Sequence, residues 1–335
     1  MEALSANFKE MTRRLTITLF CLLVAMSCSK EVMDFFRGFE KPVNFPEPAY
    51  SLTKNPVTAA GFTLGKTLFF DSTLSIDQST SCGSCHMPSS AFTHHEHDFS
   101  HGLNGALTTR NAPPLFNLAW SNSFMWDGGV AELDLQPVKP LTNPIEMGMQ
   151  LPEILRMLNA SNMYRRMFAD AFGTPVATEE KMMKALSQFM VMLISKESRY
   201  DSLQRGFVYF TSLENDGYLF FRQHCGNCHR EPLFTDNQFH NTGLPASNVA
   251  DSGRFFITRK KTDLFAFKTP SLRNLSYTKP YMHDGRFSTI DRVLDHYQKT
   301  IPISLQDRIG LKAFLKTLDD PSFIADPRFA GGGHH

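Results

Sequence analysis

Apolar side chains recur at helical spacing in several segments of the chain. In the clearest, 179–194, they return every three or four positions, as on a helix with one face in the core. Its methionines are therefore predicted to pack and not to act as metal ligands. Shorter segments of the same kind occupy 213–221 and 307–318, and Pro152 favours a helix start before 153–158. The pattern predicts a mainly α-helical protein.

A capping sequence predicts one more helix near the C-terminal end. Residues 288–291 (Ser-Thr-Ile-Asp) have the spacing of a capping box, and the helix is expected to run through Tyr297 and to stop before Pro302. Between the helices lie long Gly-, Pro- and Asn-rich stretches at 87–118, 127–150 and 230–283. Irregular segments of that length are usually functional or unfolded. We expect these to wrap a bound group.

Two copies of Cys-x-x-Cys-His stand in the chain, one in each half. The first is Cys82, Cys85 and His86, and the second is Cys225, Cys228 and His229. In c-type haem attachment the two thiols form thioethers with the porphyrin and the histidine ligates the iron. A thioredoxin-like dithiol and a zinc site also use Cys-x-x-Cys, but neither explains a histidine at the fifth position twice. Two covalently bound haem c groups are therefore predicted.

The length of 335 residues allows two domains or one large one. Because each half holds one motif, we predict two cytochrome-c-like domains, an N-terminal haem domain over 50–200 and a C-terminal haem domain over 205–325, with long irregular connecting loops. Lys plus Arg (34) nearly balances Asp plus Glu (33), so no basic excess indicates nucleic acid as a partner.

The first 28 residues resemble an export signal. A basic stretch precedes an apolar run, Leu15 to Ala25, that is too short to span a bilayer comfortably. The run ends in a sequence like a bacterial lipobox, with Cys28 as the lipid-bearing residue; ordinary signal cleavage is the alternative. Either alternative predicts export to the periplasm. The protein would contact the membrane only through a lipid on Cys28. Of six cysteines, Cys21 lies in the signal, and none is left for a disulfide.

Several spaced motifs go beyond haem attachment. They are Arg110-Asn111-Ala112-Pro113, Trp126-Asp127-Gly128, Gln136, Glu146-Met147-Gly148, Ser271-Leu272-Arg273-Asn274 and Pro280-Tyr281-Met282-His283-Asp284-Gly285. With these motifs, the chain from about residue 50 to 320 resembles the bacterial di-haem cytochrome c peroxidase family. That family includes related di-haem oxidases that mature a tryptophylquinone cofactor.

The resemblance implies a division of labour between the two haems. The N-terminal haem, with His86 as proximal ligand, would react with hydrogen peroxide, and the C-terminal haem would receive electrons from a small cytochrome or similar donor. Glu146 would overhang the distal face as acid and base, and Gln136 would position peroxide or a water. Trp126 would lie between the haems. Without the resemblance, Glu146 would be read as a loop carboxylate and Trp126 as a core aromatic.

Tyr297 stands where many peroxidases of this family present a methionine ligand to the second iron. The tryptophylquinone-maturing oxidases have tyrosine there. A phenolate would favour ferric iron, whereas a thioether raises the potential. His296 would offer an imidazole after a slip of one residue, and Tyr297 could instead pack on the haem edge.

His101 occupies the place of a second histidine that blocks the reactive iron in many family peroxidases, although a two-residue insertion separates it from Arg110. A nearby cluster consists of His94, His95, Glu96 and His97. This cluster is read as a metal site or, more simply, as a solvated loop, and one of its histidines could substitute for His101.

The resemblance further implies a calcium ion held by the Asn111 side chain and the carbonyls of Thr278 and Pro280, oxygen ligands that suit this ion; Asn111 as a turn cap is the alternative. It leaves monomer and homodimer both open.

Two other functions compete with peroxide reduction. Tyr297 favours an oxidase that draws electrons from a partner protein or small aromatic, whereas an electron carrier with both irons saturated would need no distal acid such as Glu146.

Overall fold

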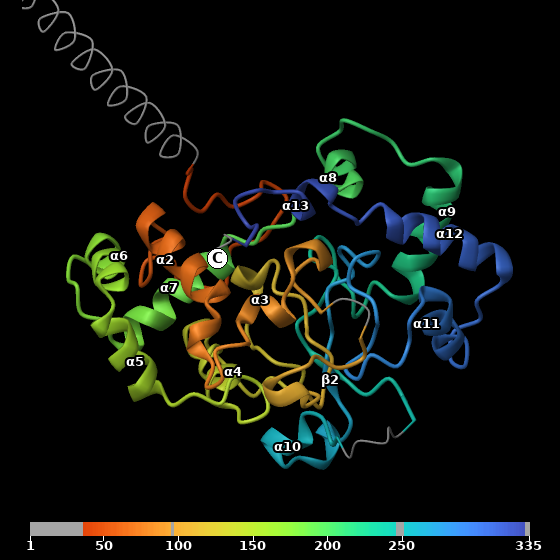
Figure 1. Cartoon of the computed structure of the whole chain (residues 1–335). Coiled ribbons are helices and arrows are strands. Elements are labelled where there is room, and N and C mark those ends of the chain that lie inside the picture. The colour runs from red at the N-terminus through yellow and green to blue at the C-terminus, as the bar shows by residue number, and fades with distance from the viewer. Residues whose placement is uncertain (1–35, 95–96, 246–250, 332–335) are drawn as a thin grey trace, which may run out of the picture. The chain divides into compact units, whose positions relative to one another are not determined.

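The computed structural model describes residues 36–94, 97–245 and 251–331 (Figure 1). The chain divides into two units after Glu40, and both haem motifs lie in the second unit, Lys41–His335. The predicted signal with Cys28, as well as His95 and Glu96, lies outside the described residues. Within the described ranges, no helix has both the length and the apolar character needed to cross a membrane.

One group of helices forms in the N-terminal half of the second unit (Figure 1). It contains α2 (Ala59–Phe70), α5 (Leu151–Ala160), α6 (Asn162–Phe172) and α7 (Glu179–Val191). Helix α2 lies directly on α7 because glycines allow a close approach: a Cβ at Gly65 would stand 1.9 Å from the carbonyl oxygen of Ala185. Phe69 and Phe189 fill the interface, with ring centroids 5.0 Å apart.

A second group contains α9 (Ser212–His224), α11 (Ile290–Tyr297) and α12 (Leu305–Lys316). Helices α9 and α12 also meet at glycines, since a Cβ at Gly217 would stand 1.9 Å from the carbonyl oxygen of Gly310. The fully buried rings of Phe221, Phe234 and Phe314 form the centre of this core. Each haem motif thus lies beside its own packed pair of helices.

The remaining elements are short. They are α3 (Cys82–Cys85), α4 (Val138–Thr142), α8 (Arg199–Gln204), α10 (Phe255–Thr258) and α13 (Pro321–Ile324); the 3-10 turns Ser72–Leu74, Pro88–Ser90, Leu103–Gly105, Leu118–Trp120, Leu133–Leu135 and Lys261–Asp263; and the strands β1 (Phe239–His240) and β2 (Phe267–Lys268). The strands pair antiparallel, with Phe239 opposite Lys268.

The mainly α-helical prediction is confirmed, and helices occur at all five predicted places. One N-cap is wrong by a residue: the capping box predicted Ser288, whereas Thr289 caps the helix that begins at Ile290, and the Thr289 hydroxyl accepts from the Arg292 amide. The domain bounds 50–200 and 205–325 remain a prediction. The chain returns at α13, where Phe323 packs against Phe92 and Phe116 of the N-terminal half.

The loops that follow the two haem motifs repeat one backbone path. A β-bridge joins Phe124 to Val130 in the first loop and Tyr281 to Phe287 in the second. Inside each bridge stands a methionine with positive φ, Met125 at +70° and Met282 at +74°, and a glycine of similar φ follows three residues later. Trp126 and His283 therefore occupy equivalent positions in the two loops.

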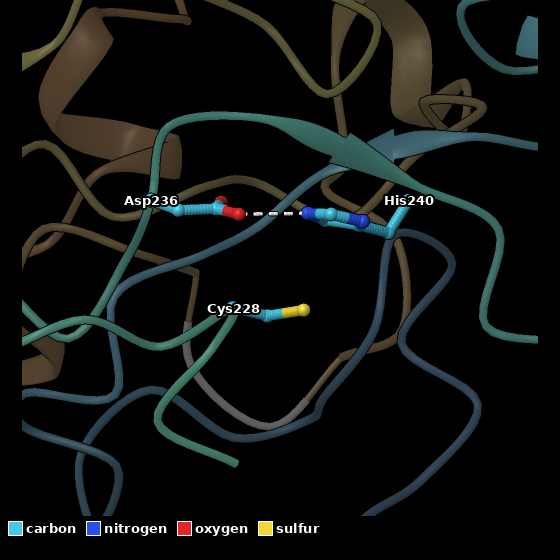
Figure 2. A group of neighbouring side chains, drawn as sticks. All are labelled: Cys228, Asp236 and His240. Carbon is cyan, nitrogen blue, oxygen red and sulfur yellow. Dashed lines mark hydrogen bonds and ion pairs between the residues drawn. The ribbon is translucent and has the colours of Figure 1, made fainter.

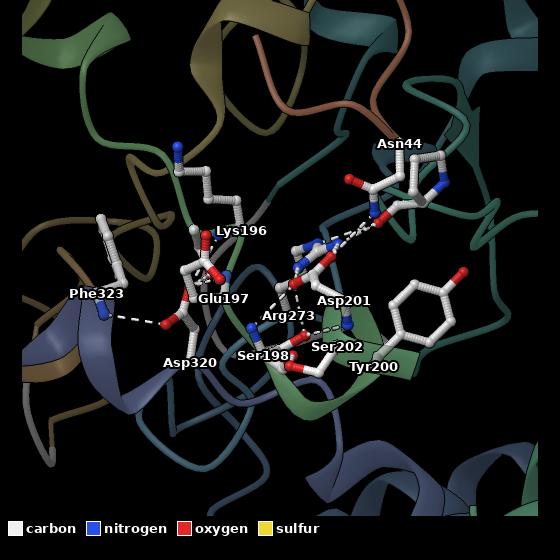
Figure 3. Close-up of polar contacts among 12 residues, drawn as sticks. Asn44, Lys196, Glu197, Ser198, Tyr200, Asp201, Ser202, Arg273, Asp320 and Phe323 are labelled. Atoms are coloured by element: carbon white, nitrogen blue, oxygen red, sulfur yellow. Dashed lines mark hydrogen bonds and ion pairs between the residues drawn. The ribbon is translucent and has the colours of Figure 1, made fainter. Parts of the chain in front are cut away.

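Buried polar contacts near α8 hold together segments that are far apart in the sequence (Figure 3). The Arg273 guanidinium donates to both carboxylate oxygens of Asp201 and to the Pro232 carbonyl. Nearby, one oxygen of the Asp320 carboxylate accepts from the backbone amides of Lys196 and Glu197 at 2.8 and 2.9 Å. The segment between α7 and α8 is thereby held to the C-terminal part of the chain.

Candidate active site

A cavity of about 520 Å³ lies among loops from both halves of the second unit. Its lining includes the predicted site residues Cys85, His86, Asn111, Trp126, Gln136 and Glu146. Lys268 and its neighbours line it from the C-terminal half. A smaller cavity of about 40 Å³ touches Cys82 as well as His86 and Glu146. The predicted proximal histidine and the predicted distal residues therefore line one cavity.

The first attachment motif holds its histidine in a single tautomer. Nδ1 of His86 lies 2.8 Å from the carbonyl oxygen of Phe92. Because a carbonyl can only accept, Nδ1 carries the proton and Nε2 keeps its lone pair for a metal. Burial lowers the pKa of His86 to about 4, partly opposed by the bond to Phe92. The ring is therefore neutral near pH 7, as an iron ligand must be.

The cysteines of both motifs are half-buried free thiols. Burial raises the pKa of Cys82 to about 12 and that of Cys225 to about 11. A redox-active dithiol needs the opposite shift, toward thiolate at neutral pH. These sites fit thiols consumed in covalent attachment better than a thioredoxin-like pair.

Glu146, which lines the same cavity, is held by Asn143, a residue that the sequence did not single out. Asn143 Nδ2 donates to Glu146 Oε1 at 2.7 Å, and Asn143 Oδ1 accepts from the amide of Ile145 at 3.0 Å. Asparagine often forms such a turn by bonding the backbone amide two residues later, and this tendency could have pointed to Asn143 from the sequence. Burial raises the pKa of Glu146, whose negative charge in turn acts on Cys82 and Cys85. The carboxyl thus lies near the attachment thiols and can hold a proton.

Trp126 joins the two halves beside this cavity. Its indole Nε1 donates to the Asn111 carbonyl at 2.8 Å, and its own carbonyl accepts from the Lys268 amide at 2.8 Å. Arg110 lies nearby between two carboxylates, 2.6 Å from Asp127 and 2.7 Å from Asp251. The indole is buried, as a core aromatic would be, and it lies between the loops of both motifs.

The second motif repeats the first. Helix α9 ends directly before Cys225, and Nδ1 of His229 lies 3.1 Å from the Phe234 carbonyl, so Nε2 is again left for a metal. Burial also lowers the pKa of His229. The two buried, neutral histidines, each beside two thiols, fit two haem c groups.

Tyr297 and His296 face different surroundings at the end of α11. Burial raises the pKa of Tyr297 to about 12, and the charges of Cys225 and Cys228 add to the shift. The phenol therefore lies near the second attachment site. His296 instead uses Nε2 to donate to the Thr242 carbonyl at 2.9 Å. Tyr297 thus has the better position of the two to meet a second haem.

The chain aligns with characterised proteins over most of its length. A family model described as di-haem cytochrome c peroxidase matches residues 59–208. The methylamine utilization protein MauG of Methylorubrum extorquens is 35% identical, over 87% of this chain and 86% of that protein. The cytochrome c551 peroxidase of Nitrosomonas europaea is 30% identical, over 93% of both. This chain belongs to the di-haem cytochrome c peroxidase family.

Solved structures of this family have the same fold. A MauG-like protein associated with microbial copper homeostasis superimposes with a TM-score of 0.82 and 32% identity, covering 88% of this chain and 99% of its own. The diheme peroxidase BthA from Burkholderia thailandensis matches with a TM-score of 0.70 at 21% identity, which shows the fold alone. Family membership implies haem c as cofactor and oxidoreductase chemistry, and it does not separate peroxidases from MauG-type oxidases.

A feature of this family member that the sequence analysis did not single out lies beside Cys228 (Figure 2). Ligand atoms of Cys228, Asp236 and His240 lie within 4.8 Å of one another, and His240 Nε2 is 2.8 Å from Asp236 Oδ2. Such a trio could hold a metal ion in another protein. The attachment motif predicts that Cys228 is consumed as a thioether, whose sulfur offers no thiolate, and under that prediction the Asp236–His240 pair is a neighbour of the haem edge.

His101 is exposed and does not line the larger cavity in the described structure. Its ring lies 5.2 Å from that of His97 and 6.4 Å from that of His94, while its carbonyl is 4.0 Å from the Cys85 sulfur. The ligand nitrogens of these rings do not converge as a metal site would require. His101 as a ligand of the first iron therefore stays a prediction.

Asn111 and Pro280, two of the three predicted calcium ligands, are in contact. Asn111 Nδ2 donates to the Pro280 carbonyl at 2.7 Å, and the Asn111 amide donates to the His283 carbonyl at 2.8 Å. Asn111 is buried and ties the two family loops together. With the side-chain amide turned over, Oδ1 and the Pro280 oxygen would both face a cation, so these donors are compatible with calcium.

Proposed function

We propose that this protein is a di-haem c-type peroxidase that reduces hydrogen peroxide to water. Electrons would come from a small cytochrome or similar donor and enter at the second haem site. The observation that carries the proposal is Glu146, a partly buried carboxyl of raised pKa in the same cavity as the predicted proximal ligand His86. A simple electron carrier has no use for such a group.

Glu146 serves as the proton carrier of the reaction. Reduction of one peroxide takes up two electrons and two protons and releases two waters. The bound haem supplies the iron at which peroxide is held and reduced. The Glu146 carboxylate accepts a proton from one peroxide oxygen and returns it to the leaving oxygen, while Asn143 holds the carboxyl in place. Acid–base help of this kind contributes about 10² to 10⁴ in rate.

Gln136 and Trp126 have supporting roles. The Gln136 amide, 3.8 Å from the sulfur of Met125, lines the cavity and orients peroxide or a water. Because cytochrome donors deliver one electron at a time, a second haem stores one equivalent. Trp126, packed between the loops of the two motifs, is the route by which electrons cross.

A second candidate function rests on Tyr297. Its phenol lies near Cys225 and Cys228, where a phenolate ligand would favour ferric iron and lower the potential of the second haem. That ligand suits an oxidase of the MauG type, which draws electrons from a partner protein or a small aromatic. The similarity to MauG at 35% identity supports this alternative as much as the peroxidase relatives support the first.

Turnover with peroxide and a reduced small c-type cytochrome tests the proposal. The purified haem-loaded protein should oxidise two cytochromes for each peroxide consumed. Peroxide that is consumed only when a protein or aromatic substrate replaces the cytochrome would favour the oxidase. If peroxide does not perturb the Soret band of the half-reduced protein, the electron carrier is the better description.

Three further features belong to the proposal. The protein is exported to the periplasm and lipid-anchored at Cys28, calcium is held at Asn111, Thr278 and Pro280, and two copies of the chain form a homodimer. The contact between Asn111 and the Pro280 carbonyl supports the second feature. The first rests on the sequence of the N-terminal segment.

A further inference from the structure

One cation lines the large cavity without a carboxylate partner. The ammonium group of Lys268, on β2, donates to the Ser123 carbonyl and stands 5.8 Å from the centre of the Phe124 ring. Among the residues that the structure describes, no carboxylate influences its pKa: burial is the single cause, and it lowers the pKa to about 8. Arg110, which lines the same cavity, has two carboxylates of its own.

Lys268 is half-buried, and a cation withdrawn from water without a counter-ion is costly, so natural proteins usually pair such groups. The cavity that Lys268 enters is the one lined by Cys85 and His86, where the first haem is attached. Haem c brings two propionate carboxylates into that space. The porphyrin therefore carries the anionic charge that the protein does not provide near Lys268.

We propose that the Lys268 ammonium group is the counter-ion of a propionate of the haem bound at His86. The proposal rests on haem attachment and not on peroxide turnover. It gives Lys268 a positioning role: the lysine comes from the C-terminal half and orients the haem of the N-terminal half.

The position of Lys268 gives this contact a second consequence. The Lys268 amide donates to the carbonyl of Trp126, and its neighbour Phe267 stacks on His283 at 3.6 Å. The ammonium group therefore lies at the junction of the two equivalent loops. A positive charge beside a porphyrin disfavours ferric iron, which carries one more positive charge than ferrous iron. Lys268 accordingly raises the potential of the first haem.

The test compares four haem-loaded variants by spectroelectrochemical titration in the absence of peroxide. Lys268→Met and Lys268→Gln remove the charge, and Gln keeps a donor for the Ser123 carbonyl. Lys268→Arg keeps the charge, and Lys260→Met removes an exposed lysine from the same segment. The expected result is a lower midpoint potential of the first haem in the Met and Gln variants, with wild-type values in the other two.

A second readout reports the contact itself. The propionate bending band in the resonance Raman spectrum should shift in Lys268→Met and Lys268→Gln and stay in place in Lys260→Met. Haem content by mass shows that each variant is loaded, and Lys268→Gln covers the case in which Lys268→Met fails to load. An unchanged potential and Raman band in a fully loaded variant would overturn the proposal. An equal effect of Lys268→Arg would also overturn it, because the change would then be due to packing and not to charge. An effect confined to the second haem would overturn it as well.

Discussion

Arg273 and Asp201 form an ion pair that is closed to solvent. Two parallel bonds of 2.7 and 2.8 Å join them, and the side chains are 0% and 1% exposed. The guanidinium also lies over the rings of Phe45 and Phe234. The family motif Ser-Leu-Arg-Asn thus serves the fold: its arginine ties the loop after the second haem motif to α8.

Asp201→Asn should lower the stability of the haem-loaded protein by about 3–5 kcal/mol, because it leaves the Arg273 charge buried and unpaired. Denaturant unfolding followed by circular dichroism measures the effect. The matched control is Arg156→Gln, which breaks the exposed pair with Glu153 and should not move the unfolding midpoint. Equal effects of both changes would contradict the buried-pair argument.

Glu146→Gln should lower peroxide turnover by about 10² to 10⁴ while haem content stays normal, because the amide cannot shuttle the proton. Steady-state oxidation of reduced cytochrome measures the rate, and intact mass measures the haem. Glu132→Gln, at an exposed carboxylate of the same half, is the control and should keep full activity. Unchanged turnover in Glu146→Gln would remove this residue from the mechanism.

The pH profile offers a separate check on the same carboxyl. Burial raises the pKa of Glu146, and the group accepts a proton only when ionised. The rate should therefore fall as the pH drops through this raised pKa, at a pH above that of an ordinary glutamate. The acid limb of kcat/KM should disappear in Glu146→Gln. If the acid limb of kcat/KM persists in Glu146→Gln, it reports the titration of a group other than Glu146.

Local motifs predicted the chemistry better than they predicted its arrangement. Cys82, Cys85 and His86 lie within five consecutive residues, so haem attachment could be predicted directly from the sequence. The choice between Tyr297 and His296 could not, because adjacent positions on a helix point about 100° apart and only packing fixes the rotation. Helix α2 was missed because it is apolar on most sides and contains Gly61 and Gly65, which weaken helical propensity but let α7 approach.

Pairings across the two halves were also invisible in the sequence. Lys268 meets Trp126 and Ser123 only after both loops have folded, and Asp236 and His240 approach Cys228 within an irregular stretch. No periodic pattern marks such contacts. Asn143 is different, since its spacing from Glu146 is a local turn signal that could have been used.

Tyr297→Met should raise the midpoint potential of the second haem, because a thioether replaces an anionic oxygen ligand. The absorption and EPR spectra of the oxidised protein should change in parallel. His296→Gln should leave the spectra close to wild type, since His296 bonds the Thr242 carbonyl instead. If Tyr297→Phe has the spectrum of the wild type, the phenol packs on the haem edge and is not a ligand.

Metal analysis tests two further predictions: that Cys228, Asp236 and His240 bind no zinc, and that Asn111 binds calcium. The purified protein should contain two iron atoms per chain and no stoichiometric zinc, because a Cys228 consumed as a thioether, as the attachment motif predicts, could not complete a site with Asp236 and His240. His240→Ala should therefore leave the metal content unchanged. Asn111→Leu should remove calcium while both haems remain, because the Asn111 side chain is the one side-chain ligand in the predicted calcium set. Zinc that disappears in His240→Ala would contradict the haem-edge reading, and calcium retained in Asn111→Leu would place that ion elsewhere.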